Sequence, residues 1–209
     1  LLFEISQNLN KYDRYEIVLV DDSSTDDTYK KISQLHQKNI KVISNKKNSG
    51  QSFSIIQGIK KSTYNTIITM DGDGQNDPKD IPKLLDLFLK NEEVKLVGGI
   101  RFKRKDNIIK IISSKIANYV RLRILDDDCK DTGCSLKVFE KKIILKFPYF
   151  DGMHRFLPAL FKGFGYKTKF LNVNHRKRNY GVSKYGTVNR FFKGIRDIIK
   201  VRNIIKKNH

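Results

Sequence analysis

The chain has 209 residues, enough for one domain with a substantial core, and no segment has the composition of a linker. Lysine and arginine total 42 against 22 aspartate and glutamate residues, so with a formal net charge of +20 the expected partner is anionic: nucleic acid, a membrane surface or a phosphorylated substrate. No run of about 18 uncharged apolar residues is present, so we expect no membrane span, and two cysteines are too few for a disulfide framework.

The first predicted strand ends in a cluster of acidic residues. Residues 2–11 have helical periodicity, and the apolar run 15–20 stops abruptly at Asp21 and Asp22. Ser24, Thr25 or Asp26 can cap the helix that follows, but capping does not explain the two carboxylates that precede them. Carboxylates at this position can accept hydrogen bonds from the base and ribose of a nucleotide. We therefore expect Asp21 and Asp22 to bind one.

A second strand ends in the same way. A strand at 40–43 and a helix at 51–62 precede the apolar run 66–70, which stops at Asp71-Gly72-Asp73-Gly74-Gln75-Asn76-Asp77-Pro78. The glycines allow a sharp turn, so the oxygens of Asp71, Asp73 and Gln75 can converge on Mg²⁺ or Mn²⁺. The alternative is an ordinary surface turn, because Asp, Gly and Asn are common turn formers.

The alternation of these segments predicts an α/β fold. A helix starting at Pro78 and a strand at 94–100 continue the pattern, which is typical of a parallel sheet covered by helices on both faces. The acidic strand ends at 21 and 71 would then lie on one edge of the sheet, where ligands bind in such folds.

The second half of the chain is more basic. Arg101, Lys103, Arg104 and Lys105 follow the strand at 94–100, and we expect Arg101 to contact phosphate oxygens, although a basic run is most often a solvated face. Another acidic turn at Asp131 precedes a strand at 134–139. A strand at 166–173 ends in the loop 175–186, which is dense in phosphate-binding side chains.

The last segment, 187–207, predicts a basic amphipathic helix. Its apolar residues recur mostly at intervals of three and four, and lysine and arginine occupy the other face. This pattern is typical of a helix that lies on an anionic membrane surface. The same apolar face can instead pack on the sheet, and the two roles do not exclude each other.

Six motifs occur in the order found in one family. They are 21–26, Asn48-Ser49-Gly50, 71–78, Asp131-Thr132-Gly133-Cys134, 153–158, and His175-x-x-Arg178-x-x-Gly181-x-Ser183-Lys184-Tyr185. Together they resemble the family 2 glycosyltransferases, and within that family the dolichol-phosphate mannose synthases and bacterial polyprenyl-phosphate sugar transferases. The resemblance implies the nucleotide-diphospho-sugar transferase (GT-A, Rossmann-like) fold with a mostly parallel sheet.

The sequence departs from this family in two places. Ser23 stands where glycine is commoner, and the strand that usually comes first, with its nucleotide-binding motif, is missing. That strand is usually interior to the sheet, so we expect the sequence to be a fragment of a longer gene product whose start was lost. We also expect one glycosyltransferase domain with three parts: a nucleotide-binding half at 1–100, an acceptor half at 101–186 and the basic helix at 187–209.

The resemblance implies an inverting transfer of a hexose, with mannose or glucose as candidates, from a nucleotide-diphosphate sugar to a polyprenyl phosphate. Mg²⁺ or Mn²⁺ would bind Asp71, Asp73 and Gln75. Asp131 would lie near the reacting sugar carbon, where it would orient the substrate or act as a general base; the alternative is that it only fixes a turn. Asp73 and Asp131 are the expected catalytic residues. The expected substrate-binding residues are Asp21, Asp22, Asp71, Arg101, Arg178, Ser183 and Lys184. The enzyme would act peripherally at the cytoplasmic face of a membrane.

Three alternatives remain open. A family 2 transferase with a soluble or glycan acceptor would need a carboxylate base to activate a hydroxyl group. A relative that keeps the fold without activity fits the missing strand but not the intact metal motif. A nucleic-acid-binding protein fits the charge, but the acidic strand ends would repel a phosphate backbone, so we expect no nucleic acid partner.

Overall fold

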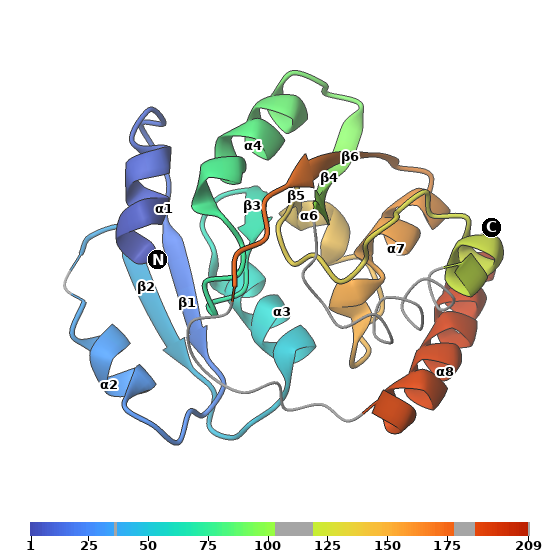
Figure 1. Ribbon diagram of the computed structural model, residues 1–209, viewed down its shortest axis with the longest axis horizontal. Helices are drawn as coiled ribbons and strands as arrows, with labels where there is room; N and C mark the ends of the chain where they lie inside the picture. Colours follow the sequence, from blue (N-terminus) through green and yellow to red (C-terminus); the bar gives the residue numbers. More distant parts are fainter. Residues whose placement is uncertain (36, 103–118, 178–186, 209) are drawn as a thin grey trace.

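The computed structural model describes residues 1–35, 37–102, 119–177 and 187–208 (Figure 1). Strands and helices alternate through the first half, as the sequence pattern predicts. The elements are α1 (Leu2–Leu9), β1 (Ile17–Asp21), α2 (Thr28–Ser33), β2 (Ile40–Ser44), α3 (Gln51–Lys61), β3 (Thr66–Thr69), η1 (Pro78–Asp80), α4 (Ile81–Leu89) and β4 (Val94–Arg101).

The second half adds shorter elements around the same core. Residues 119–125 are helical. The other elements are β5 (Lys137–Glu140), α6 (Lys141–Ile144), η2 (Met153–Arg155), α7 (Leu157–Gly163), β6 (Lys167–Val173) and α8 (Thr187–Lys206). None of the helices in the described ranges is long and apolar enough to cross a membrane.

The strands form two sheets. β1 and β2 pair in parallel, and a second sheet has the order β3-β5-β4-β6. β5 lies antiparallel between β3 and β4, so these two strands, neighbours in the parallel pattern of the sequence, do not pair with each other. β4 and β6 pair in parallel.

The sheet is interrupted between β1 and β3. Thr63, two residues after the end of α3, donates its backbone N–H to the side chain of Glu16, which directly precedes β1. The chain then enters β3, so β1 and β3 both start near the C-terminal end of α3. A cavity of about 640 Å³ separates the two strands, with walls from α1, β1, α3, β3 and α4. Its lining includes Leu2, Ile55 and Ile67.

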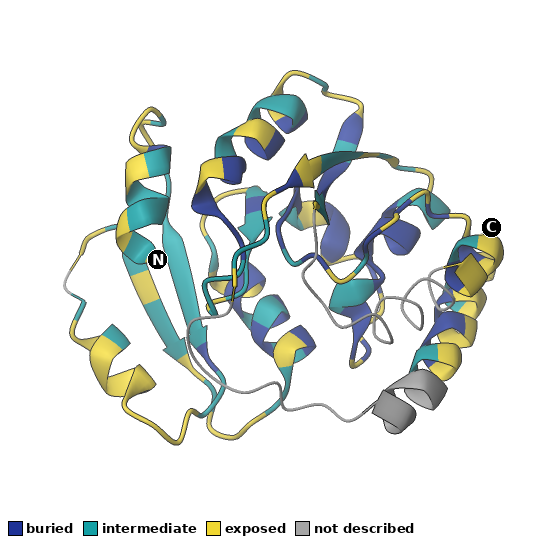
Figure 2. Cartoon of the chain, in the orientation of Figure 1, coloured by how far each residue is buried: buried dark blue, intermediate teal, exposed yellow. Residues whose placement is uncertain are grey.

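The core is built on both faces of the β3-β5-β4-β6 sheet. Side chains alternate along β5, so Val138 packs under α4 with Leu84, whereas Phe139 packs against α7 with Phe161. Figure 2 shows the buried residues gathered around these strands and α7, while α2 is mostly exposed and the β1–β2 pair is half-buried. The rigid support for the strand ends therefore comes mainly from the second sheet.

Candidate active site

The N-terminus of α3 joins the two acidic strand ends. Asp22, directly after β1, accepts hydrogen bonds from the backbone N–H groups of Ser49 at 2.9 Å and Gly50 at 2.8 Å. The next residue, Gln51, donates its side-chain amide to Asp71 after β3 at 2.7 Å. Gly50 has φ of +88°, a backbone conformation that favours glycine. The acidic residues after β1 and those after β3 therefore lie beside the same end of α3.

Asp21 and Ser23 shape the turn after β1. The side chain of Asp21 is buried and accepts hydrogen bonds from the hydroxyl groups of Ser24 and Ser44. Ser23 has φ of +60°, in the left-handed region where glycine is favoured. This explains why glycine is the commoner residue here in the family that the sequence resembles, and it places backbone strain beside the expected nucleotide site.

Hydrogen bonds hold Asp22 in its ionised form. Burial, the largest influence, raises the pKa of this carboxyl group, but hydrogen bonds from Asn45, Ser49 and Gly50 together outweigh it, so the pKa lies below its usual range. The carboxylate oxygens that we expected to bind a nucleotide thus already accept bonds within the turn before α3.

Asp22→Asn is expected to remove an acid-sensitive part of the stability. Because the folded-state pKa is depressed, the stabilisation by Asp22 is fully present above its unfolded value of about 3.9 and is lost as pH falls through the folded value. Urea unfolding at pH 7 and pH 3 measures this. The variant should be less stable than wild type at pH 7, with a smaller difference at pH 3. An equal difference at both values would contradict the prediction, and Asp13→Asn, at an exposed turn, is the control.

The loop after β3 is tightly folded. The backbone N–H of Asp71 bonds Ser135 Oγ at 3.2 Å, and Asp73 Oδ1 accepts the N–H of Gln75 at 3.0 Å. Gly74, with φ of +77°, allows the turn. Burial and the neighbouring charge of Asp73 raise the pKa of Asp71, whereas the Ser135 hydroxyl and the charges of Lys137 and Arg101 lower it; the net shift is upward.

The donor set of this loop fits a hard divalent cation. Two carboxylates that repel each other and an amide supply oxygen atoms of the kind that Mg²⁺ and Mn²⁺ prefer, and a cation between them would relieve the repulsion. In the described ranges, no three His, Cys, Asp or Glu side chains form a metal-binding cluster. A cation here would depend on Gln75, water and substrate for its other ligands.

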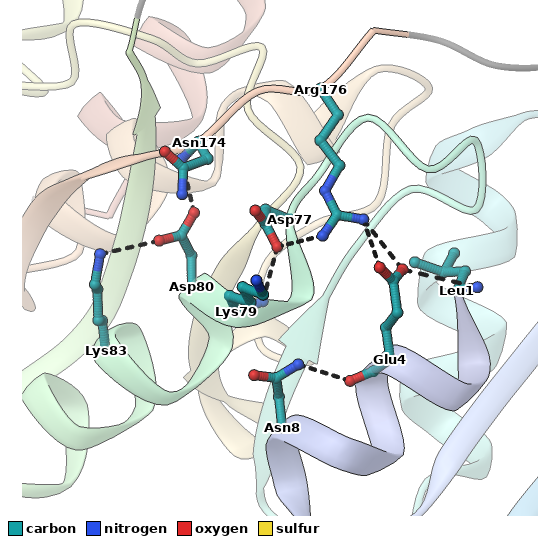
Figure 3. A network of polar contacts seen from close by, with 9 residues as sticks. All are labelled: Leu1, Glu4, Asn8, Asp77, Lys79, Asp80, Lys83, Asn174 and Arg176. Atoms are coloured by element: carbon teal, nitrogen blue, oxygen red, sulfur yellow. Dashed lines mark hydrogen bonds and ion pairs between the residues drawn. The ribbon is translucent and has the colours of Figure 1, made fainter.

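The segment after β6 docks onto the same loop. The backbone N–H of Arg176 donates to the carbonyl of Gln75 at 2.8 Å, and the side chains of Gln75 and His175 approach to 3.3 Å. Figure 3 shows the Arg176 guanidinium between Asp77, at 2.6 Å, and Glu4 of α1, at 2.9 Å. The predicted phosphate-binding residues Arg178, Ser183 and Lys184 lie outside the described residues.

Arg101 at the end of β4 forms a two-pronged ion pair with Asp131. Its Nε and Nη2 atoms each lie 2.7 Å from a carboxylate oxygen, and its backbone N–H donates to Asp131 at 3.1 Å. A Cβ atom at Gly133 would come within 2.7 Å of this guanidinium, so glycine gives it room. Arg101 and Asp131, for which the sequence predicts different roles, are thus joined in one ion pair.

Sequence reasoning missed Gln51 and Lys137. Gln51 reads as an ordinary first residue of a helix, and nothing in the predicted strand at 134–139 singles out Lys137. Lys137 is instead buried, at the start of β5, which is an interior strand with a neighbour on each side. The sequence contains no local signal for this pairing.

The chain matches a known protein family and resembles characterised enzymes in sequence. The family model described as glycosyl transferase family 2 matches residues 4–147. The chain is 38% identical over 194 residues to dodecaprenyl-phosphate galacturonate synthase of Rhizobium johnstonii, covering 90% of this chain and 57% of the relative. It is 30% identical over 174 residues to undecaprenyl-phosphate 4-deoxy-4-formamido-L-arabinose transferase of Pectobacterium carotovorum, covering 82% and 53%. The chain thus spans about half the length of these relatives.

A solved structure has the same fold. Glucosyl-3-phosphoglycerate synthase from Mycobacterium tuberculosis, in complex with Mn²⁺, UDP-glucose and phosphoglyceric acid, superposes with a TM-score of 0.69 at 14% identity, covering 96% of this chain and 74% of that one. This likeness establishes the GT-A fold expected from the sequence. The relatives' names contain galacturonate and formamido-arabinose, whereas the mannose or glucose expected from the sequence stays a prediction.

Proposed function

Because this chain belongs to glycosyl transferase family 2, we propose that it transfers a sugar from a nucleotide-diphosphate sugar to the phosphate of a polyprenyl lipid. The observation that carries the proposal is that the acidic ends of β1 and β3, strands of two different sheets, meet at the N-terminus of α3. Gly50 and Gln51 at the N-terminus of α3 bond Asp22 after β1 and Asp71 after β3, and the Arg101–Asp131 pair lies at the end of β4, in the same sheet as β3. The polyprenyl-phosphate names of the two relatives support the acceptor class.

Asp71, Asp73 and Gln75 are the proposed ligands of Mg²⁺ or Mn²⁺. Such a cation, when bound, would neutralise charge on the leaving diphosphate. Asp73 is held by the N–H of Gln75 and Asp71 by the amide of Gln51, so both carboxylates are oriented before a ligand arrives. Asp21 and Asp22 shape the turn on the nucleotide side, and their direct contact with a base or ribose remains a prediction.

The acceptor chemistry needs little proton transfer. A lipid phosphate is already an anion and can attack the anomeric carbon without a general base, with inversion. Asp131 is engaged by the Arg101 guanidinium, so we assign it an orienting role rather than that of a free base. Arg101, Arg178, Ser183 and Lys184 are the proposed phosphate contacts.

A transfer assay tests the proposal. Purified protein, Mn²⁺ and a short polyprenyl phosphate would be supplied in turn with nucleotide-activated galacturonate, 4-deoxy-4-formamido-L-arabinose, mannose and glucose. We expect one donor to yield a glycolipid. Transfer to a soluble hydroxyl acceptor but not to the lipid would favour the alternative acceptor class. No transfer with any pair by a folded, Mn²⁺-binding protein would contradict the proposal.

We also propose that α8 holds the enzyme peripherally at the cytoplasmic face of a membrane. One face of the helix packs in the core through Ile198 and Val201, but Ile195 and Ile199 are 40% and 53% exposed. Arg196, Lys200 and Arg202 are exposed as well. Exposed apolar and basic side chains on one helix are typical of a contact with anionic lipid.

Ile199→Asn is expected to weaken binding to anionic vesicles at least about threefold, because it removes apolar surface that can enter the lipid. Co-sedimentation at low and high salt measures this, and salt should weaken the binding of the wild-type protein. Leu89→Asn removes an apolar side chain with 54% exposure at the end of α4 and serves as the matched control. Equal sedimentation of both variants would contradict the role of α8.

A further inference from the structure

The backbone after β6 is connected to two of the proposed cation ligands by successive hydrogen bonds. The backbone N–H of Arg176 donates to the carbonyl of Gln75 at 2.8 Å. The N–H of Gln75 in turn donates to Asp73 Oδ1 at 3.0 Å. A displacement of Arg176 would therefore be transmitted to the main chain of Gln75, whose N–H holds the Asp73 carboxylate.

The Arg176 side chain bridges two carboxylates from different elements (Figure 3). Its Nη2 atom lies 2.6 Å from Asp77 Oδ1, and its Nη1 atom lies 2.9 Å and 3.1 Å from the two carboxylate oxygens of Glu4 on α1. An ion pair between two exposed side chains contributes little. The Asp77 side chain, however, is only 12% exposed and also accepts the backbone N–H of Lys79 at 3.0 Å. The guanidinium thus has a fixed partner in the loop after β3.

The other partner is also on a fixed element, because α1 is anchored to the core and to α4. Leu9 of α1 is buried in the same apolar cluster as Leu85 of α4. Shortly after α1, Tyr12 Oη donates to Asp86 of α4 at 2.7 Å. Glu4 therefore belongs to a helix that is held at its far end, and the guanidinium joins two supported elements.

We propose that Arg176 is a positioning residue of the donor site: by bonding Asp77 and Glu4 together, it holds the segment after β6 against the loop after β3 and keeps Gln75 in place for a divalent cation. The inference rests on the proposed function, in which Gln75 is a ligand of that cation. A planar guanidinium presents five N–H donors in a fixed fork and can bond two carboxylates at once. Groups that orient metal ligands in this way typically change metal affinity about 10-fold to 100-fold when they are removed.

Backbone hydrogen exchange tests the docking directly. In Arg176→Gln we expect exchange at least about threefold faster in peptides that cover 71–80 and 172–177, with no change in β5. Lys79→Gln removes an exposed charge from the same network but leaves the backbone N–H that donates to Asp77, so it is the matched control and should exchange as wild type. Unchanged exchange in both segments of Arg176→Gln, or equal acceleration throughout the chain, would overturn the inference.

Two further substitutions separate the halves of the bridge. Asp77→Asn keeps an acceptor for the N–H of Lys79 but removes the charge that faces Arg176, and we expect the same local acceleration as in Arg176→Gln. Glu4→Gln leaves the Asp77 half intact and should accelerate exchange less. The double variant Asp77→Asn with Arg176→Gln should exchange no faster than either single variant. Additive effects would show that Asp77 and Arg176 do not act as a pair, which contradicts the inference.

Mn²⁺ binding without nucleotide tests the consequence, because the two effects of the substitution have opposite signs. Removal of a nearby positive charge would by itself strengthen the binding of a cation. Displacement of a ligand would weaken it, and we expect Arg176→Gln to bind Mn²⁺ about tenfold more weakly than wild type. Arg176→Lys keeps the charge but not the fork and should lie between the two. Equal or tighter Mn²⁺ binding by folded Arg176→Gln would overturn the role of Arg176 toward the cation.

The two measurements also separate this inference from the proposed function. If Arg176→Gln does not fold, Arg176→Lys supports both measurements, with smaller effects in the same direction. Neither hydrogen exchange nor the Mn²⁺ titration needs sugar transfer. A wild-type protein that binds Mn²⁺ but transfers no sugar would therefore refute the proposed function, while exchange and Mn²⁺ binding would still decide the role of Arg176.

Discussion

Asp73→Ala is expected to lower transfer at least about 100-fold and to weaken binding of the nucleotide sugar in the presence of metal but not in its absence. The substitution removes a proposed cation ligand, and electrostatic stabilisation of this kind contributes about 100-fold to 1,000-fold to turnover in other enzymes. It also removes the like charge that helps raise the pKa of Asp71. Asp71 should then ionise more readily without restoring activity.

The measurement compares donor binding with and without Mn²⁺ for wild type and Asp73→Ala. Asp13→Ala, in the exposed turn between α1 and β1, is the matched control and should behave as wild type. Transfer by wild-type protein in excess chelator, or an equal loss of donor binding with and without Mn²⁺ in Asp73→Ala, would contradict the metal role of Asp73.

Asp127→Ala is expected to reduce the free energy of unfolding by about 3–5 kcal/mol, because it leaves the Arg121 charge buried without its partner. Asp127 is fully buried and Arg121 is 3% exposed. The guanidinium binds Asp127 and the carbonyl of Cys129, while Asp127 accepts the N–H of Cys129 at 3.1 Å. The pair therefore fixes the turn that leads to Asp131.

A double variant separates the cost of an unpaired charge from the value of the pair. Arg121→Met with Asp127→Asn removes both charges and keeps an acceptor for the Cys129 N–H. Replacement of a buried pair by neutral groups is often nearly neutral, so this variant should recover most of the lost stability in urea unfolding. Additive losses in the double variant would show that the two side chains are not coupled.

The strand ends were predictable from the sequence, and the pairing of the strands was not. Apolar runs that stop at Asp21 and Asp71 define β1 and β3 because both signals are local. The insertion of β5 between β3 and β4 depends on contacts over about 70 residues, and no local pattern encodes such a pairing. For that reason the sequence does not predict the burial of Lys137.

The structure gives two of the predicted charged site residues partners that the sequence does not predict. Arg101 was expected to contact phosphate, and the structure pairs it with Asp131, 30 residues later. Asp22 was expected to bind a nucleotide, and its carboxylate accepts bonds from the turn before α3. In both cases the sequence identified the charge and the edge of the sheet, but not which partner lies within hydrogen-bonding distance.

The interrupted sheet has a consequence for handling the protein. The edges of β1 and β3 that face the cavity have no strand partner in the described ranges, and apolar side chains surround them. Unpaired strand edges are templates for β-pairing with another chain, and natural proteins usually cover or charge them. The 209-residue chain should therefore aggregate at high concentration despite its net charge of +20, and a high-salt buffer, which screens that charge, should accelerate the process.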